Sequence, residues 1–145
     1  MARYTHSTDS KGRVIIPAKL REDLGLICYV TVSLDRGYLA VYTERQWEGL
    51  RAQLDELPGT NPVVRRLRRT IIGEAIRCQL DGQGRIAIND ELWETIDIAG
   101  GDEVYIIDLG DSLQICSRSF FDAQRAEELP IDELDLSAFD VRGIL

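Results

Sequence analysis

Short apolar segments separated by turn residues form two series along the chain, and both series run in the same order. Each predicts a strand, an Asp-x-x-Gly-Arg turn, a second strand, a short helix, two strands and a longer helix. The first series comprises strands at 4–7, 13–16, 29–34 and 38–42 and a helix at 44–57. The second comprises strands at 75–80, 85–88, 103–108 and 112–116 and a helix at 119–128. The pattern predicts an α+β fold that is mainly β, with intervening helices.

Local signals mark the ends of the helices. The segment 44–57 carries apolar residues at helical spacing, namely Trp47, Leu50, Leu54 and Leu57. Pro17 and Asn89 are typical residues at the start of a helix, and they precede the two short helices. Gly25 and the pair Gly100-Gly101 are expected to end those helices.

The two series are also similar residue by residue. The segment 9–20, DSKGRVIIPAKL, aligns with 81–92, DGQGRIAINDEL, at an offset of 72. Trp47 aligns with Phe121 at an offset of 74, and we expect both, with Trp93, to anchor the core. Such self-similarity indicates a tandem duplication whose two units are related by a pseudo-two-fold axis. Because each unit is too small to bury much core alone, we expect the two to interleave hairpins into one shared sheet structure.

The duplication divides the chain into four segments. They are a first repeat at 1–57, a linker with an arginine-rich helix at 58–73, a second repeat at 74–128 and an acidic tail at 129–145. The linker predicts a helix from Pro62 to Ile72, around which Arg65, Arg66, Arg68 and Arg69 spread. These arginines either reach nucleic acid or pair with the acidic second half of the same or a neighbouring subunit. The tail mixes acidic and apolar residues without a clear period, which is typical of a loosely held end.

The distribution of charge changes what the composition alone would suggest. A net charge of −8 argues against nucleic acid as a partner. However, residues 1–80 hold 13 basic and 9 acidic side chains, whereas residues 81–145 hold 4 and 16. Residues 1–21 carry five basic groups and one acidic group, which favours a surface that binds phosphate. Of the 17 basic residues 15 are arginines, which suit phosphates and base edges as well as salt bridges between subunits.

The two Asp-x-x-Gly-Arg turns are the main candidates for function. In each turn an aspartate precedes an arginine by four residues, in the pairs Asp9–Arg13 and Asp81–Arg85. An ion pair there would hold the guanidinium in one direction, so that it could contact a guanine edge or a phosphate. Alternatively, each pair only closes a hairpin. Lys11, Lys19 and Arg21 lie close to Arg13 in sequence and favour a binding role for the first turn.

The sequence contains few residues or motifs that could support catalysis. His6 is the only imidazole and is expected to be structural in its strand, and no nucleophile, metal or cofactor motif accompanies it. Cys28, Cys78 and Cys116 are set among apolar residues, which favours buried thiols in a reducing cytosol over a disulfide or a metal site. No apolar run is long enough for a membrane helix, and residues 1–13 lack the apolar core of a signal peptide.

Several of these motifs together resemble the MraZ family. They are DSKGRVIIPAKLR at 9–21, LDGQGRIAI at 80–88, GYLAVY at 37–42 with Trp47, and the arginine-rich middle helix. Either turn alone would indicate only the broader AbrB/MazE-like swapped-hairpin class. The resemblance implies a pseudo-symmetric pair of swapped-hairpin units that assembles into a ring. It further implies a repressor of the bacterial division and cell wall gene cluster that binds direct repeats in promoter DNA, in the cytoplasm at the nucleoid and without a cofactor.

The resemblance also assigns roles to the turn residues. Lys11 and Arg13 match the family's DNA-contacting turn, and Asp9 matches its supporting residue. Asp81 and Arg85 match the second turn, and we count the basic residues Lys19 and Arg21 with the DNA surface. Gln83 replaces a basic residue and Asn89 stands where the family usually has proline, so the second turn is either a weaker DNA reader or purely structural.

A protein-interaction or antitoxin-like module without promoter specificity is the alternative. The segment 127–145 has six acidic residues and one arginine, and it could occupy a basic groove on a partner.

Overall fold

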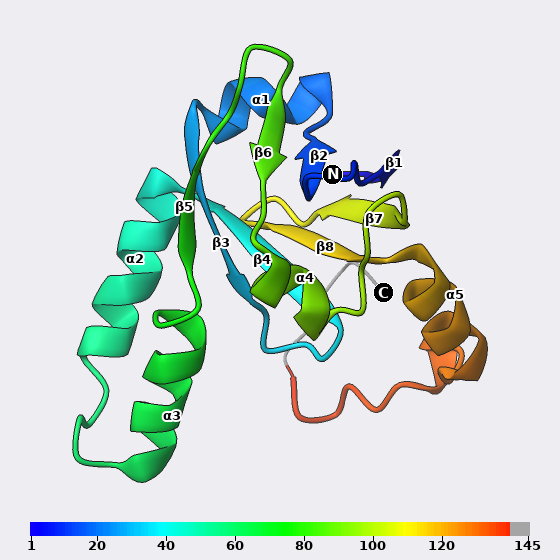
Figure 1. Ribbon diagram of the computed structural model, residues 1–145. Coiled ribbons are helices and arrows are strands. Elements are labelled where there is room, and N and C mark those ends of the chain that lie inside the picture. The colour runs from blue at the N-terminus through cyan, green and yellow to red at the C-terminus, as the bar shows by residue number, and fades with distance from the viewer. Residues whose placement is uncertain (140–145) are drawn as a thin grey trace.

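The computed structural model describes residues 1–139, which adopt an α+β fold with antiparallel strands (Figure 1). The strands are β1 (Arg3–Ser7), β2 (Arg13–Ile15), β3 (Ile27–Val32), β4 (Tyr38–Thr43), β5 (Ile76–Gln79), β6 (Arg85–Ala87), β7 (Glu103–Asp108) and β8 (Leu113–Ser117). The helices are α1 (Ala18–Leu24), α2 (Glu44–Asp55), α3 (Pro62–Ile71), α4 (Asp90–Thr95) and α5 (Arg118–Glu127), followed by the 3-10 turn η1 (Ile131–Glu133). The α-helices occupy at least as much of the chain as the strands, so the expectation of a mainly β protein was wrong.

One sheet takes strands from both halves of the chain. Its order is β1-β7-β8-β4-β3-β5, and β2 and β6 form a second, two-stranded sheet. The first strand of each half therefore lies beside the third strand of the other half, as β1 beside β7 and β5 beside β3. If each strand is exchanged for its counterpart in the other half, the same order is read backwards. The expectation of one shared sheet is confirmed.

The turns after β1 and β5 connect two sheets and do not close hairpins. β1 and β2 are not neighbours in either sheet, nor are β5 and β6, so the hairpin expectation was wrong. The reason is that β2 and β6 pair with each other, with Val14 opposite Ile86. At the ends of this ladder the N–H of Ile16 donates to the carbonyl of Gly84 at 2.9 Å, and the N–H of Ile88 donates to that of Gly12 at 3.1 Å.

The main core lies between the large sheet, the β2–β6 pair and the short helices α1 and α4. Its most completely buried apolar side chains come from both halves, and they include Val14, Ile16, Val30, Leu39, Val41, Ile86, Leu92, Val104, Ile106 and Ile115. Val14 and Ile86 each alternate with more exposed neighbours, as a strand with one buried face requires. Neither half could bury these residues alone.

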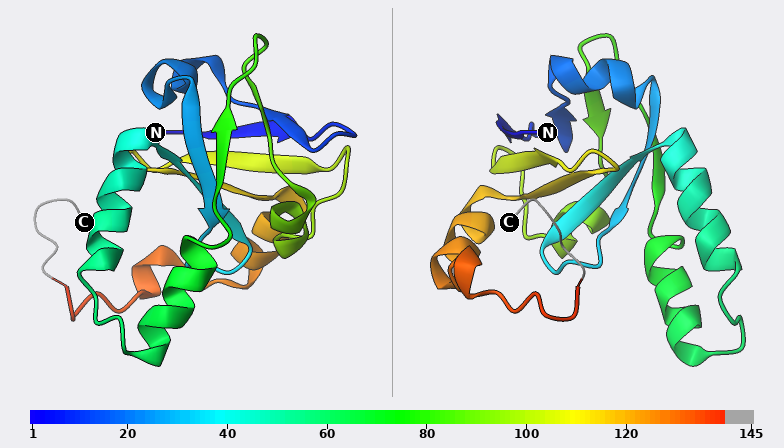
Figure 2. Two further views of the ribbon diagram at one scale, coloured as in Figure 1. Left: turned by 60° about the vertical axis from the view of Figure 1, so that its left-hand side comes forward. Right: turned by 180° about the vertical axis from the view of Figure 1, so that it is seen from behind.

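A second apolar cluster holds the α2–α3 hairpin against β3 and β4. Trp47 of α2 is buried and stacks on Tyr29, with ring centroids 5.2 Å apart. Leu54 of α2 and Ile71 of α3 are buried in the same cluster. The buried hydroxyl of Thr31 donates to the carbonyl of Ile71 at 2.5 Å, which joins the end of α3 to the sheet. From this base the two helices run side by side away from the sheet (Figures 1 and 2).

Helix α5 packs on the same face of the sheet as α2, at the other end of the sheet, and among residues 1–139 no helix there corresponds to α3. Phe121 of α5 is half-buried and meets Tyr105 edge to face, with centroids 5.1 Å apart. The guanidinium of Arg3 lies 4.5 Å from the Tyr105 centroid and 4.9 Å from that of Phe121. The guanidinium of Arg3 therefore covers the Tyr105–Phe121 pair. In the first half, the Tyr29–Trp47 pair instead lies in the cluster that includes α3. Trp47 and Trp93 are buried as predicted, while Phe121 is only partly so.

The observed ends of several strands and helices differ from the predicted ends by a few residues. Leu34 is exposed in the loop after β3, because that strand begins two residues earlier than predicted and ends at Val32. The pair Gly100-Gly101 does not end α4, which was an error: α4 ends at Thr95. Asp97 follows the end of α4 and has a positive φ of 55°, so it supplies the left-handed conformation that was expected of a glycine. Gly25 follows α1 as predicted.

Gly12→Ala should lower the free energy of unfolding by about 2 kcal/mol, because a left-handed residue with a side chain is strained by roughly 1–2 kcal/mol. Gly12 has φ +73°, and a Cβ there would lie 2.8 Å from the Ile88 carbonyl oxygen and 3.2 Å from Trp93 Nε1. Gly82→Ala in the second turn is the matched control, since nothing lies within 4 Å of its Cβ position, and it should change stability by less than about 0.5 kcal/mol. Urea denaturation measures both; equal effects would contradict the tight approach of Gly12 to the second half.

Candidate nucleic-acid interface

The first turn is organised around the carboxylate of Asp9. Its Oδ1 accepts hydrogen bonds from the backbone N–H groups of Lys11 at 2.9 Å and Arg13 at 2.8 Å. Its Oδ2 accepts from Nε of Arg13 at 2.6 Å. One aspartate therefore fixes both the path of the backbone and the direction of the arginine.

The second turn repeats this arrangement. Asp81 Oδ1 accepts from the backbone of Gln83 at 2.9 Å and of Arg85 at 3.0 Å, and Oδ2 accepts from Arg85 Nε at 2.8 Å. The side chains of Arg13 and Arg85 are 30% and 23% exposed. In both turns only Nε is used, and within residues 1–139 no acceptor is bound to the Nη groups. The planar edge that suits a phosphate or a guanine thus remains available.

Hydrogen bonds keep both aspartates ionised. The backbone N–H of Arg13 is the main cause that lowers the pKa of Asp9, and the guanidinium of Arg13 adds to it against a smaller effect of desolvation. The backbone N–H and the guanidinium of Arg85 lower the pKa of Asp81 in the same way. Each turn therefore holds a charged ion pair at neutral pH.

Each turn is supported by the short helix of the other half. The indole Nε1 of Trp93, in α4, donates to the carbonyl of Gly12 at 2.9 Å. In the second turn, a Cβ at Gly84 would overlap the guanidinium of Arg21, whose Nε donates to the carbonyl of Ile16 at 2.7 Å. Arg21 and Trp93 occupy matching positions of the two repeats, so an arginine supports one turn and a tryptophan the other.

The predicted basic residues are consequently divided between the two turns. Lys11 and Arg13 lie at the first turn, whereas Arg21 lies against the second turn, and Lys19 is exposed on the same helix α1. Sequence proximity to Arg13 was misleading here, because the chain crosses to the other half after β2. The alignment of Arg21 with Trp93 was the available signal for this placement.

The surroundings of the first turn include acidic residues that the sequence analysis did not connect with it. Asp90 and Glu94 of α4 line a shallow hollow together with Ser10 and Gly12. Both carboxylates lie close to a turn that the charge count of residues 1–21 had treated as basic. An anion that approaches the first turn from the side of this hollow therefore meets negative charge.

The arginine-rich helix α3 lies away from the second turn. Arg68 pairs with Asp55 of α2 at 2.8 Å, while Arg65, Arg66 and Arg69 are exposed. In all views the loop between β5 and β6 lies at the end of the molecule opposite to α3 (Figures 1 and 2). A subunit therefore presents α3 and the second turn in different places.

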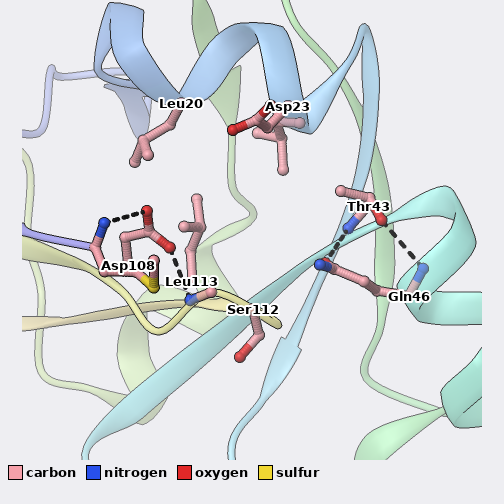
Figure 3. A pocket seen from close by; sticks show the side chains of 10 residues that line it. Leu20, Asp23, Thr43, Gln46, Asp108, Ser112 and Leu113 are labelled. Atoms are coloured by element: carbon pink, nitrogen blue, oxygen red, sulfur yellow. Dashed lines mark hydrogen bonds and ion pairs between the residues drawn. The ribbon is translucent and has the colours of Figure 1, made fainter.

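A pocket between α1, the start of α2 and the β7–β8 turn has a volume of about 190 Å³ (Figure 3). Four of the residues that line it are paired with one another. Gln46 and Thr43 form a reciprocal capping pair, and the carboxylate of Asp108 binds the amino group of Met1 at 3.1 Å. Leu20, Leu24 and Leu113 supply its apolar wall. Among residues 1–139 every fully buried side-chain nitrogen and oxygen has a partner, and the exposed Asp23 adds a carboxylate to the rim of the pocket.

The remaining residues considered for chemistry lie apart. Cys28, Cys78 and Cys116 are buried and free, as predicted, and Cys28 lies opposite Cys78 on β3 and β5. Burial raises the pKa of Cys116 to about 12, which makes its thiol unreactive. His6 lies on β1 opposite Val104. Within residues 1–139 no three potential ligands are grouped for a metal, and no helix has the length and apolar character needed to cross a bilayer.

Known proteins resemble this chain over most of its length. Residues 1–70 match the family described as "MraZ protein, putative antitoxin-like". "Transcriptional regulator MraZ" of Thermoanaerobacter sp. (strain X514) is 38% identical over 122 residues, which cover 84% of this chain and 83% of the relative. The protein of the same name from Coxiella burnetii (strain RSA 493 / Nine Mile phase I) is 35% identical over 132 residues, 86% of each chain. That of Lachnoclostridium phytofermentans is 45% identical over 92 residues, 63% of this chain and 64% of the relative. The chain therefore belongs to the MraZ family, and it is a transcriptional regulator and not an enzyme.

Proposed function

We propose that this regulator binds direct repeats in promoter DNA as a ring of several subunits and represses the division and cell wall gene cluster. The observation that supports this most strongly is the aspartate-held arginine, which is built twice with the same set of hydrogen bonds. Because the aspartate already holds Nε, the arginine side chain loses less conformational entropy on binding DNA than a free surface arginine would. The two Nη groups can then bind a guanine edge or a phosphate in a bidentate manner.

The turn residues have separate roles in this proposal. Arg13 reads DNA, the exposed Lys11 contacts phosphate, and Asp9 positions the arginine. Arg85, held by Asp81, makes a second contact, weaker because the neutral Gln83 replaces the lysine. Lys19 contacts phosphate beside the second turn, and Arg21 acts there mainly by supporting Gly84.

The strand exchange supports the finer description of the fold. β1 pairs with β7 and β5 pairs with β3, which is the arrangement expected of two swapped-hairpin units of the AbrB type. We propose that the segments 1–57 and 74–128 are these units. The segment 58–73 is then an insertion that carries α3, and 129–145 is an appended tail.

A ring resolves the conflict between the net charge of −8 and a DNA partner. If the first turns of all subunits lie on one rim, several weak contacts act together, and avidity exceeds the single-site affinity by a factor on the order of 10² or more. Repeats spaced by about 10 bp would present the same groove to successive subunits. The protein would act in the cytoplasm, at the nucleoid, and needs no cofactor for such binding.

An antitoxin-like interaction module is the second candidate. It is favoured by the tail, where Ile131 is 78% exposed, Phe139 is 66% exposed and acidic residues lie between them. In that function the tail and not Arg13 would determine binding to a partner protein.

Arg13→Ala should weaken binding to direct-repeat DNA at least tenfold, because one bidentate contact is worth about 1–3 kcal/mol and its removal would affect each subunit of a ring. Fluorescence anisotropy at several salt concentrations measures this, with DNA taken upstream of the protein's own gene. The logarithmic salt slope should also fall by about 1 for each phosphate that is no longer bound. Arg36→Ala, an exposed arginine in the β3–β4 loop, is the control. If wild type and Arg13→Ala bind equally well, the first turn has only a structural role. If neither protein binds the DNA, the alternative function as a protein-interaction module is favoured.

Asp9→Asn distinguishes a role of Asp9 in positioning Arg13 from an effect of its negative charge alone. If Asp9 positions Arg13, the substitution should weaken binding to the repeats about 3–10-fold, since a hydrogen bond between charged groups is replaced by a weaker one. If Asp9 only adds negative charge near DNA, its removal should strengthen binding to repeat and scrambled DNA alike. Comparison of the two DNAs by anisotropy distinguishes these results. The pKa of Asp9 is lowered, so the comparison holds across neutral pH. Asp81→Asn should have the smaller effect.

A further inference from the structure

The outer surface of α3 combines positive charge with apolar side chains. Arg65, Arg66 and Arg69 are exposed, and among residues 1–139 none of them forms an ion pair. Val63 is 75% exposed at the start of the helix, and Leu57 is 40% exposed in the turn before it. The helix projects from the sheet together with α2, so this surface is accessible from several directions (Figures 1 and 2).

The tail after α5 has the complementary composition. Its apolar side chains are exposed, namely Leu129, Ile131, Leu134, Leu136 and Phe139. Acidic residues precede them at the end of α5, namely Glu127 and Glu128, or lie between them, namely Asp132, Glu133 and Asp135. So many large apolar side chains in one short exposed segment are typical of a surface that binds a partner.

Within one chain the two surfaces do not meet. No hydrogen bond or ion pair joins α3 to the tail in the part of the chain that the structure describes. The tail leaves α5 at the other end of the sheet and runs below the sheet toward α2 and α3 (Figures 1 and 2). Within residues 1–139 the acidic, apolar segment and the basic, apolar helix therefore form no polar contact with each other.

We propose that the tail of one subunit, residues 127–139, binds along α3 of a second copy of this chain. The inference rests on the self-association proposed above and identifies the surfaces that mediate it. The apolar side chains of the tail would bury themselves against Val63 and Leu57, and its carboxylates would face Arg65, Arg66 and Arg69. Because the tail and α3 are two different surfaces, the contact is head to tail, and each copy can bind one neighbour through its tail and another through its α3.

Charge complementarity favours a second copy over DNA as the occupant of α3. The segment 127–139 carries five carboxylates and no basic residue, and the other half of this contact is a helix with four arginines. The helix also lies at the end of the molecule opposite to the second turn, so one short DNA segment would have difficulty in reaching both (Figure 2).

Two charge-reversed proteins test the contact. The first carries Arg65→Glu, Arg66→Glu and Arg69→Glu; the second carries Asp132→Lys, Glu133→Lys and Asp135→Lys. Arg68 is left in place because it pairs with Asp55. Sedimentation velocity should show that each variant alone associates at least tenfold more weakly than the wild type, because like charges now face each other. An equimolar mixture should recover assembly, since the acidic tail of the first protein fits the basic helix of the second and its acidic helix fits the basic tail.

The controls make each outcome decisive. Arg36→Glu, Arg45→Glu and Arg77→Glu change the net charge by the same amount at exposed positions outside α3 and should leave assembly unchanged. Circular dichroism verifies the fold; should a reversal unfold the chain, the corresponding Arg→Gln and Asp→Asn or Glu→Gln variants replace it. Assembly that is insensitive to both reversals overturns the proposal. Recovery when both reversals are combined in one chain, without recovery in the mixture, overturns it in favour of a contact within the chain. A wild type that remains monomeric refutes the self-association itself, while DNA binding is tested separately through Arg13.

Discussion

The pairing of β2 with β6 is the constraint on which the rest of the structure depends. The two strands are short, yet they carry Val14 and Ile86, which are among the most deeply buried side chains of the core. The ladder closes only if the carbonyls of Gly12 and Gly84 reach Ile88 and Ile16. Each turn is therefore held by hydrogen bonds from the opposite half. Because the same turns carry Arg13 and Arg85, the geometry of the candidate DNA surface depends directly on the contact between the halves.

The two halves are similar in strand order but have diverged in what covers them. α2 contributes Trp47, Leu50 and Leu54 to the apolar cluster that includes α3, and the aligned positions of α5 are Phe121, Gln124 and Glu128. The polar pair needs no covering helix, and Gln124 instead accepts a hydrogen bond from the hydroxyl of Tyr38 at 2.8 Å. Phe121 is the apolar residue that remains, and Arg3 covers it with a cation–π contact. The second half is thus adapted to the absence of an equivalent of α3, which leaves α3 itself as the asymmetric element of the molecule.

The sequence was informative wherever structure is determined locally. The turns predicted at 9–13 and 81–85, the start of α2 at Glu44 and the strand Glu103–Asp108 are all observed. They follow from an Asx-type turn with glycine, a capping threonine and an apolar run, whose effects extend over a few residues. The position of α1 beside the second turn depends on which strands pair, and local patterns carry no information on that. For the same reason Arg21 was grouped with Arg13, although its guanidinium lies against Gly84. Asp97 took the place of Gly100-Gly101 because an aspartate also tolerates a left-handed conformation.

The distribution of charge in three dimensions is more specific than the division into a basic and an acidic half. Asp90 and Glu94 accompany the first turn, and the strongest concentration of positive charge lies on α3. If α3 bound DNA, the turns would have to reach the same duplex from another end of the molecule. If α3 binds the acidic tail of a neighbour, each contact neutralises arginines and carboxylates that would otherwise oppose assembly. The cations that remain exposed at the turns are then the Nη groups of Arg13 and Arg85, with Lys11 at the first turn and Lys19 beside the second. Assembly would in this way remove α3 as a competing site for DNA and leave binding to the turns, where aspartates hold two arginines in a fixed direction.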